Sequence, residues 1–195
     1  MSDRTPARVL WLLAGVLLLV YPVLRPWDDE TTLAGVVAWD GDAWILSHTA
    51  AMLGLMATSA AAILDVAVRR PIAVLVVVGT AFVLPYYGAE AFGLPMVGEL
   101  ARQSGDVATG DVAEDFRYGV VPTIFFGVGL VTLAVAGVRL LLTRRPGAGL
   151  LGFWLVAFLP QFFAPAPVRI AHGVVALVAG VLLATSRAPR EPAAD

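Results

Sequence analysis

The chain has 195 residues, of which 59% are apolar and 14% are charged, and its formal net charge is −2. Soluble domains carry about a quarter charged residues, so this composition excludes a soluble globular protein, a disordered chain and a nucleic-acid-binding protein. Cysteine is absent, which excludes disulfides, thiolate metal sites and quinone–disulfide chemistry. The sequence therefore predicts an all-α integral membrane protein whose direct partner is the lipid bilayer.

Six apolar segments are candidates for membrane spans, because a helix needs about 20 largely apolar residues to cross about 30 Å of hydrocarbon. No small-residue cleavage site follows the first segment, so we expect it to remain as a helix rather than to act as a signal peptide. The fifth is short and ends at Pro160, which predicts a bent or unwound end. In one domain, 1–195, the predicted spans are 9–24, 43–68, 71–96, 120–142, 149–163 and 168–185.

The arginines divide unevenly between the two ends of these spans, with nine on one side and four on the other. Cytoplasmic ends of membrane helices collect positive charge, so both termini are predicted to be cytoplasmic, in the plasma membrane of a bacterium. Ten acidic residues fall in the two long loops of the opposite side. The longer of these loops, 97–118, could form a cap over the outer face.

Ionisable residues inside spans are costly and are candidates for function. His48 lies six residues after Asp42, about 9 Å inside the outer end of the second span, and Glu90 lies about 28 Å from the inner end of the third. A carboxylate at this depth needs a hydrogen-bond donor or a cation beside it. We therefore predict an outward-facing polar cluster of His48, Glu90, His172 and Arg169, rimmed by Tyr86, Tyr87, Gln161 and Arg117.

This cluster admits several kinds of cofactor chemistry. His48, Glu90 and His172 are the residue types that hold zinc or non-haem iron, although they form no HExxH or similar motif. The two histidines could instead be axial ligands of haem b. His48, Met52 and Met56 recur at four-residue spacing, which admits copper. Each of these hypotheses describes a metal- or haem-dependent membrane enzyme acting at the outer leaflet.

Two further hypotheses for the cluster need no cofactor. It could bind a small ligand, a proton or an ion in an outward cavity, with Glu90 titrating and histidine relaying the proton. It could also be a satisfied polar network that fixes helix register in an accessory protein. No GxSxG, GxGxxG or phosphate-binding loop is present. The function expected first is therefore a non-enzymatic binding, transport or accessory protein.

Two sequence features concern packing. Ala50, Gly54, Thr58 and Ala61 place small side chains at spacings of three and four in the second span, which permits either internal packing or association into a homo-oligomer or a larger membrane complex. Asp65, near the inner end of that span, is expected to pair locally with the adjacent arginines 69 and 70.

The segments SHTAAMLGLMA and GTAFVLPYYGAEAFGLPMVGELA, within residues 44–101, resemble a widespread group of small polytopic membrane proteins of GC-rich bacteria. The likeness lies in a histidine that opens one span and, in the next, a glycine followed by glutamate and Phe-Gly-Leu-Pro. The resemblance implies the membrane topology and the co-occurrence of His48, Glu90 and His172, and it carries no activity.

Overall fold

The computed structural model describes residues 5–143 and 145–186, and every regular element in these residues is helical, so the predicted all-α fold is confirmed. A helix suits a chain this apolar, because it satisfies its backbone hydrogen bonds within each segment. The elements are α1 (Thr5–Leu24), α2 (Leu33–Val37), η1 (Ala38–Asp40), α3 (Asp42–Leu64), α4 (Arg70–Gly88), η2 (Ala89–Gly93), α5 (Leu94–Ser104), η3 (Val107–Asp111), α6 (Val112–Tyr118), α7 (Val120–Leu141), α8 (Pro146–Ala157), η4 (Pro160–Phe163) and α9 (Ala166–Thr185).

Five helical stretches in the described residues are long and apolar enough to cross a membrane: α1, α3, the continuous stretch from α4 to α5, α7 and α9. The helix α8, which falls in the fifth predicted span, has 12 residues and is about 18 Å long. The chain leaves the α-helical path before Pro160, which lacks an N–H, and continues as the short 3₁₀ turn η4. The crossing of the membrane by this sixth segment stays a prediction.

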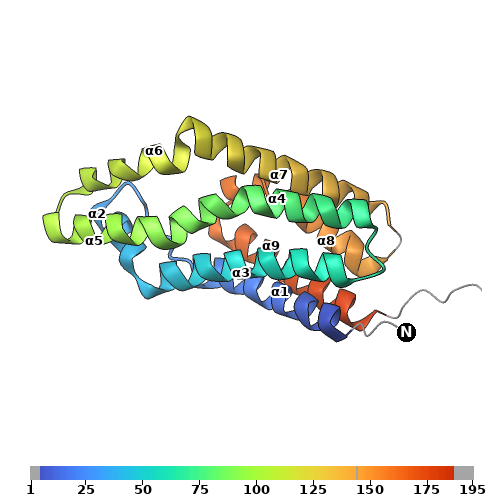
Figure 1. Ribbon diagram of the computed structural model, residues 1–195. Helices are drawn as coiled ribbons and strands as arrows, with labels where there is room; N and C mark the ends of the chain where they lie inside the picture. The colour runs from blue at the N-terminus through green and yellow to red at the C-terminus, as the bar shows by residue number, and fades with distance from the viewer. Residues whose placement is uncertain (1–4, 144, 187–195) are drawn as a thin grey trace, which may run out of the picture.

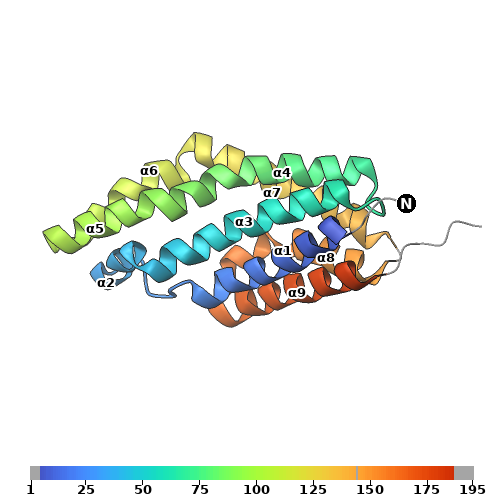
Figure 2. The ribbon, with the colours of Figure 1, turned by 60° about the horizontal axis from the view of Figure 1, so that its bottom comes forward.

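A ring is formed, in chain order, by α1, α3, α4, α7, α8 and α9 (Figures 1 and 2). Helix α1 packs against α3 and α9, α4 packs against α3 and α7, and α8 packs against α7 and α9. The contact between α1 and α9 closes the ring. The first residue of α1 and the last residue of α9 lie at the same end of the bundle (Figure 1).

A small helical cap, formed by residues 33–40 and 94–118, covers the opposite end of the ring. Helix α5 continues the path of α4 beyond the ring and forms part of the cap (Figure 2). Most of the segment 97–118, taken from the sequence as the longest loop, is helical. The cap has a hydrophobic core separate from that of the ring, made of Val36, Trp39, Trp44, Leu94, Val97, Ala101 and Ala113.

Small residues let the ring helices approach one another closely. A Cβ atom on Gly15 of α1 would lie 2.9 Å from the backbone Cα of Leu177 in α9, closer than real Cβ contacts. A Cβ on Gly54 of α3 would lie 2.8 Å from the side chain of Leu18 in α1. The predicted small-residue face of α3 therefore packs inside the chain, against α1.

The buried carboxylate at the terminal end of the ring pairs differently from expectation. Asp65 Oδ2 accepts hydrogen bonds from Trp11 Nε1, at 3.1 Å, and from Arg145 Nη1, at 3.0 Å. The predicted local pair with arginine 69 or 70 is replaced by these partners, because α3 ends at Leu64 and the extended backbone of Asp65 turns its side chain toward α1 and α8.

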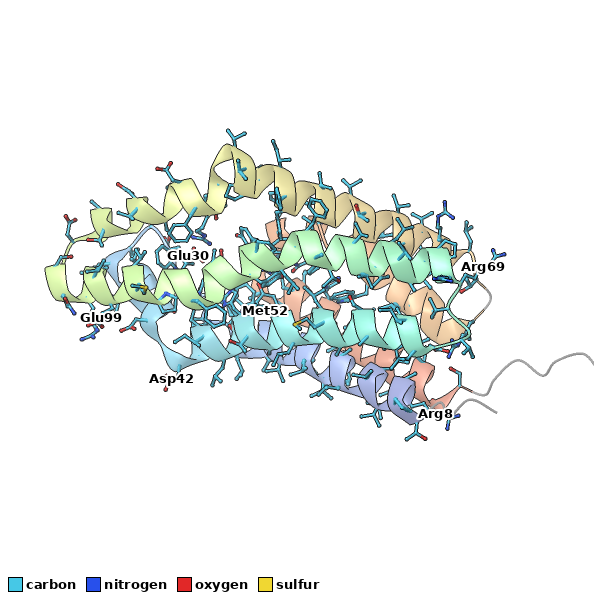
Figure 3. All side chains as sticks on the ribbon, in the orientation of Figure 1. Arg8, Glu30, Asp42, Met52, Arg69 and Glu99 are labelled. Carbon is cyan, nitrogen blue, oxygen red and sulfur yellow. The ribbon has the colours of Figure 1, made fainter. Side chains whose placement is uncertain are left out.

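Charges are separated between the two ends of the molecule. Arg8 and Arg69 lie at the end where α1 begins and α9 finishes, whereas Asp42 and Glu99 lie toward the cap (Figure 3). Four of the nine arginines assigned to the terminal side, at positions 4, 144, 187 and 190, lie outside the described residues.

Candidate functional site

A cavity of about 470 Å³ lies where the cap meets the ring. Figure 3 labels Glu30 in this region, between α5 and α6. Its wall combines aromatic and aliphatic side chains with five charged ones contributed by α6, α9, η2 and the segment after α1. The charged lining residues are Arg25, Glu30, Glu90, Arg117 and Arg169.

The shortness of α8 explains the position of the cavity. Helix α7 has 22 residues and is about 33 Å long, nearly twice the length of α8. Gly152 of α8 packs against Gly137, so the close approach of α8 lies in the second half of α7. Phe126, Gly127 and Leu130 of the first half line the cavity.

Glu90 is held in a π-helical turn, η2, between α4 and α5. Hydrogen bonds in such a turn join residues five apart, and the residue five after Glu90 is Pro95, which has no N–H to donate. Trp44 of α3 supplies the missing donor, with its Nε1 2.8 Å from the Glu90 carbonyl oxygen. The proline thus interrupts the backbone hydrogen bonding at Glu90, and the indole N–H of Trp44 in α3 replaces the missing hydrogen bond.

The Glu90 carboxylate, 2% exposed, has a cationic partner on one oxygen and an imidazole on the other. Arg117 Nε of α6 donates to Oε1 at 2.9 Å. His48 Nε2 of α3 lies 3.5 Å from Oε2. The sequence places these three residues in one predicted cluster, and the structure brings them together.

His48 is oriented by its other ring nitrogen. Nδ1 lies 2.9 Å from the carbonyl oxygen of Trp44, which can only accept, so Nδ1 carries the proton. The ring is also flanked by Trp44 and Tyr21, with centroids 4.3 and 5.3 Å away. Nε2 is therefore the ring nitrogen left free of backbone hydrogen bonds among the described residues, and it lies 3.5 Å from Glu90 Oε2.

A second carboxylate, Glu30, belongs to the site although the sequence does not predict it there. Its two oxygens accept from Arg25 Nη2 at 2.6 Å and from Arg117 Nη1 at 2.9 Å. Arg117 therefore bridges Glu30 and Glu90. Burial opposes the charge of Arg117, but the two carboxylates outweigh burial and hold the pKa of its guanidinium above the usual value, so it stays a cation.

Arg169 lies on the other side of the cavity and is only 8% exposed. Its Nε donates to Gln161 Oε1 at 3.1 Å, and its Nη2 donates to the Tyr21 hydroxyl at 3.2 Å. The guanidinium carbon also lies over the rings of Trp27 and Phe162, 4.7 and 5.3 Å from their centroids. Tyr21 connects the two sides, since its ring contacts His48 and its hydroxyl accepts from Arg169.

The two predicted tyrosines have different surroundings. Tyr86 lines the cavity and stacks on Phe126 of α7, with ring centroids 4.2 Å apart. Tyr87 is 1% exposed and packs in the core of the ring, against Tyr21 and Phe158. Tyr86 thus belongs to the cavity wall, whereas Tyr87 supports that wall behind Tyr21.

His172 borders a small void with Arg169, Gln161 and Tyr87, but its ring nitrogen bonds toward α8 rather than toward Glu90. Its Nε2 lies 2.9 Å from the Trp154 carbonyl oxygen, and its ring stacks on that indole. Among the described residues, no three His, Cys, Asp or Glu side chains are grouped closely enough to hold a metal ion. The set predicted for zinc or iron, His48, Glu90 and His172, is therefore not assembled, because α9 turns His172 toward α8.

The geometry also bears on the haem and copper hypotheses. Nε2 of His48 faces Glu90 and Nε2 of His172 faces a carbonyl, so a haem bound between the two histidines would have to displace both contacts. Met56 is 51% exposed on the surface of α3, outside the lining of the cavity.

Comparison with known proteins assigns no family to this chain: no family model, curated protein or solved structure matches it. The resemblance of residues 44–101 to a group of bacterial membrane proteins stays an expectation. The site must be interpreted from its own chemistry.

Proposed function

We propose that this chain is a bacterial plasma-membrane protein with six membrane segments and both termini in the cytoplasm, whose cavity faces outward and binds a small ligand. The unequal division of arginines supports this orientation. The short helix α8 together with η4 would provide the sixth segment. The role is binding, transport or accessory, without covalent chemistry.

The cavity itself is the observation that carries the proposal. Protein interiors are close-packed, with few voids larger than a water molecule. A polar network serving only to fix helix register would have no need of a space of about 470 Å³. Such a volume falls within the range of small-molecule sites, about 300–1,000 Å³, and those sites likewise combine apolar walls with a few polar groups.

The orientation can be tested with single cysteines, since the chain has none of its own. Ala108→Cys in the cap and Val66→Cys at the terminal end both place a thiol at an exposed position. A membrane-impermeant maleimide should label Ala108→Cys in intact cells and label Val66→Cys only after permeabilisation. The reverse pattern would overturn the proposed topology.

Ligand binding can be tested by filling the cavity. Gly127 lines it, and a Cβ there would meet no atom within 4 Å, so the larger side chain of Gly127→Leu begins in open space at the cavity wall. Gly149 on α8 is equally free of contacts and lies outside the lining, which makes Gly149→Leu the matched control. Anionic, cationic, neutral and zwitterionic probes are compared by the shift in melting temperature that each produces in phosphatidylcholine nanodiscs.

At least one probe class should stabilise the wild type and Gly149→Leu and lose this effect in Gly127→Leu. If every class acted equally on the three proteins, the cavity would not be a binding site. Metal analysis and a visible spectrum of the purified protein test the cofactor-dependent enzyme in parallel. Stoichiometric zinc or iron, or a Soret band, would replace the proposal with a cofactor-dependent one.

A further inference from the structure

We infer that the ligand of this cavity is an amphiphilic monoanion that enters from the membrane between α7 and η4 and places its charged head at Arg169. The inference rests on the proposed function, because it names the class of ligand for the same cavity. Four features support it: the charge balance of the wall, an unpaired buried amide, the apolar wall and the position of the mouth.

The charges around the cavity leave one cation without an anion. Arg25, Glu30, Arg117 and Glu90 form a continuous chain of alternating charge, joined by ion pairs of 2.6 to 2.9 Å. Arg169 stands outside this chain: in the described part of the protein, only the neutral oxygens of Gln161 and Tyr21 accept from it.

An isolated buried cation is costly, and arginine is well suited to binding carboxylate or phosphate oxygens. The rings of Trp27 and Phe162 stabilise the guanidinium in part without neutralising it. The wall carries three arginines and two glutamates, an excess of one positive charge when His48 is neutral. A ligand with a single negative charge would balance it.

Gln161 provides a second donor beside Arg169. Since the arginine Nε can only donate, the atom that faces it must be the amide oxygen of Gln161. The amide nitrogen is then left buried with no hydrogen-bond partner among the described residues, on a side chain that is 6% exposed. Gln161 borders a small void that shares Tyr21 and Arg169 with the cavity wall. An acceptor bound at Arg169 could satisfy this amide as well.

The apolar part of the ligand has a matching surface. Phe126 and Leu130 of α7, with Phe162 of η4, line the same cavity as Arg169. Leu130 lies ten residues into α7, about 15 Å from its first residue, whereas Arg169 lies in the first turn of α9. The head site and the apolar wall are therefore arranged along the helix direction, as the head and the chain of a membrane amphiphile are.

The mouth of the cavity opens toward the lipid-facing surface. The most exposed lining residues mark it, including Phe163 of η4, at 87%, and Tyr118 at the end of α6, at 54%. Beside it, α7 presents exposed apolar side chains such as Val120 and Ile124, at 76% and 57%. A molecule dissolved in the bilayer would reach this mouth directly, which favours an amphiphile over a fully water-soluble anion.

The test uses ten-carbon probes that differ only in the head group: decanoate, decanol and decylamine. Binding to the full chain in phosphatidylcholine nanodiscs is measured by isothermal titration calorimetry, with Arg169→Gln compared with Arg139→Gln, which removes an exposed arginine of α7. Decanoate should bind the wild type and Arg139→Gln, and Arg169→Gln should weaken it about tenfold or more, as expected for a lost charged hydrogen bond. Decanol and decylamine should bind more weakly than decanoate to the wild type and to Arg139→Gln, and Arg169→Gln should lose this preference for decanoate.

Equal binding of decanoate and decanol, or full decanoate affinity in Arg169→Gln, would overturn the inference. Should Arg169→Gln fail to fold, Gln161→Leu keeps the cation and removes the second donor, and its decanoate affinity must then fall below that of the wild type. Replacing part of the phosphatidylcholine by phosphatidylglycerol separates the two sources of the anion. Competition with decanoate would identify a lipid head group, and its absence a free amphiphilic acid.

The experiments distinguish an error in the proposed class of ligand from an error in the proposed binding site. If decylamine or decanol binds and Gly127→Leu abolishes that binding, the cavity is a ligand site and the anionic class is wrong. If no probe of any class distinguishes Gly127→Leu from Gly149→Leu, the ligand site itself is wrong.

Discussion

Arg117 Nε lies 2.9 Å from Glu90 Oε1, and this ion pair joins the last turn of α6 to the π-helical turn between α4 and α5. Both side chains are less than a tenth exposed. The pair therefore connects the cap to the ring through a buried contact, directly at the wall of the cavity. Its energy should be measurable, because partial removal leaves a buried charge or a buried donor without its partner.

Glu90→Gln should destabilise the protein by about 1–3 kcal/mol, because the buried charged bond to Arg117 is weakened while Arg117 keeps Glu30 as a partner. Thermal unfolding in detergent, followed by circular dichroism, measures the change. Glu114→Gln, an exposed glutamate of α6, is the control and should alter the melting temperature little. Unchanged stability and ligand binding in Glu90→Ala would contradict the role of this carboxylate.

A double-mutant cycle should show coupling between Glu90 and Arg117 of about 0.5–3 kcal/mol, since the two side chains are in direct contact. The variants are Glu90→Gln, Arg117→Gln and the double variant. The exposed pair of Glu99 and Arg102 provides a matched cycle, whose coupling should be much smaller because solvent screens exposed charges. Additive effects at Glu90 and Arg117 would show that the ion pair contributes nothing.

Trp44→Phe should cost about 1–3 kcal/mol, because the Glu90 carbonyl would lose its donor in a buried position. Trp39→Phe is a close control: Trp39 is also buried in the cap core, and its Nε1 has no partner among the described residues. Both substitutions remove similar apolar area, so the difference between their unfolding free energies reports the hydrogen bond. Equal destabilisation by the two would argue against it.

Gly180→Ala should destabilise the ring by about 1–3 kcal/mol, because its Cβ would overlap the Trp11 carbonyl oxygen of α1. Gly149→Ala should instead be neutral or stabilising by up to about 1 kcal/mol, since its Cβ meets open space and alanine favours the helix. The melting temperature of Gly180→Ala should fall below that of the wild type, whereas that of Gly149→Ala should stay the same or rise. A stable Gly180→Ala would mean that α1 and α9 are not so closely packed.

The all-helical membrane class could be predicted from the sequence because composition and the length of apolar segments act locally. A run of 20 apolar residues must form a helix in lipid wherever it lies in the bundle. The depth of a residue along a helix also depends only on the local sequence. It places His48 and Glu90 at a similar distance from the outer surface, where they contact each other in the structure. The same reasoning included Arg117, because its position next to the start of α7 fixes its depth.

Depth does not determine which face of a helix meets which neighbour. His172 was predicted beside Glu90, yet the rotation of α9 in the ring turns it toward Trp154. Glu30 and Arg25 were assigned to a loop, and only the folding of that loop onto the cap brings them to Arg117. No spacing in the sequence indicates these contacts, because they join elements that are distant along the chain.

The sequence by itself determined that the chain is an apolar helical protein with strongly polarised ends and a few buried polar residues. The tertiary structure decided that α8 stops short, that a cavity lies beside α7, and that Arg169 faces it with no carboxylate partner among the described residues. The reason is physical: hydrophobicity and helix length depend on the local chain, whereas a cavity and its unbalanced charge depend on how six helices close into a ring.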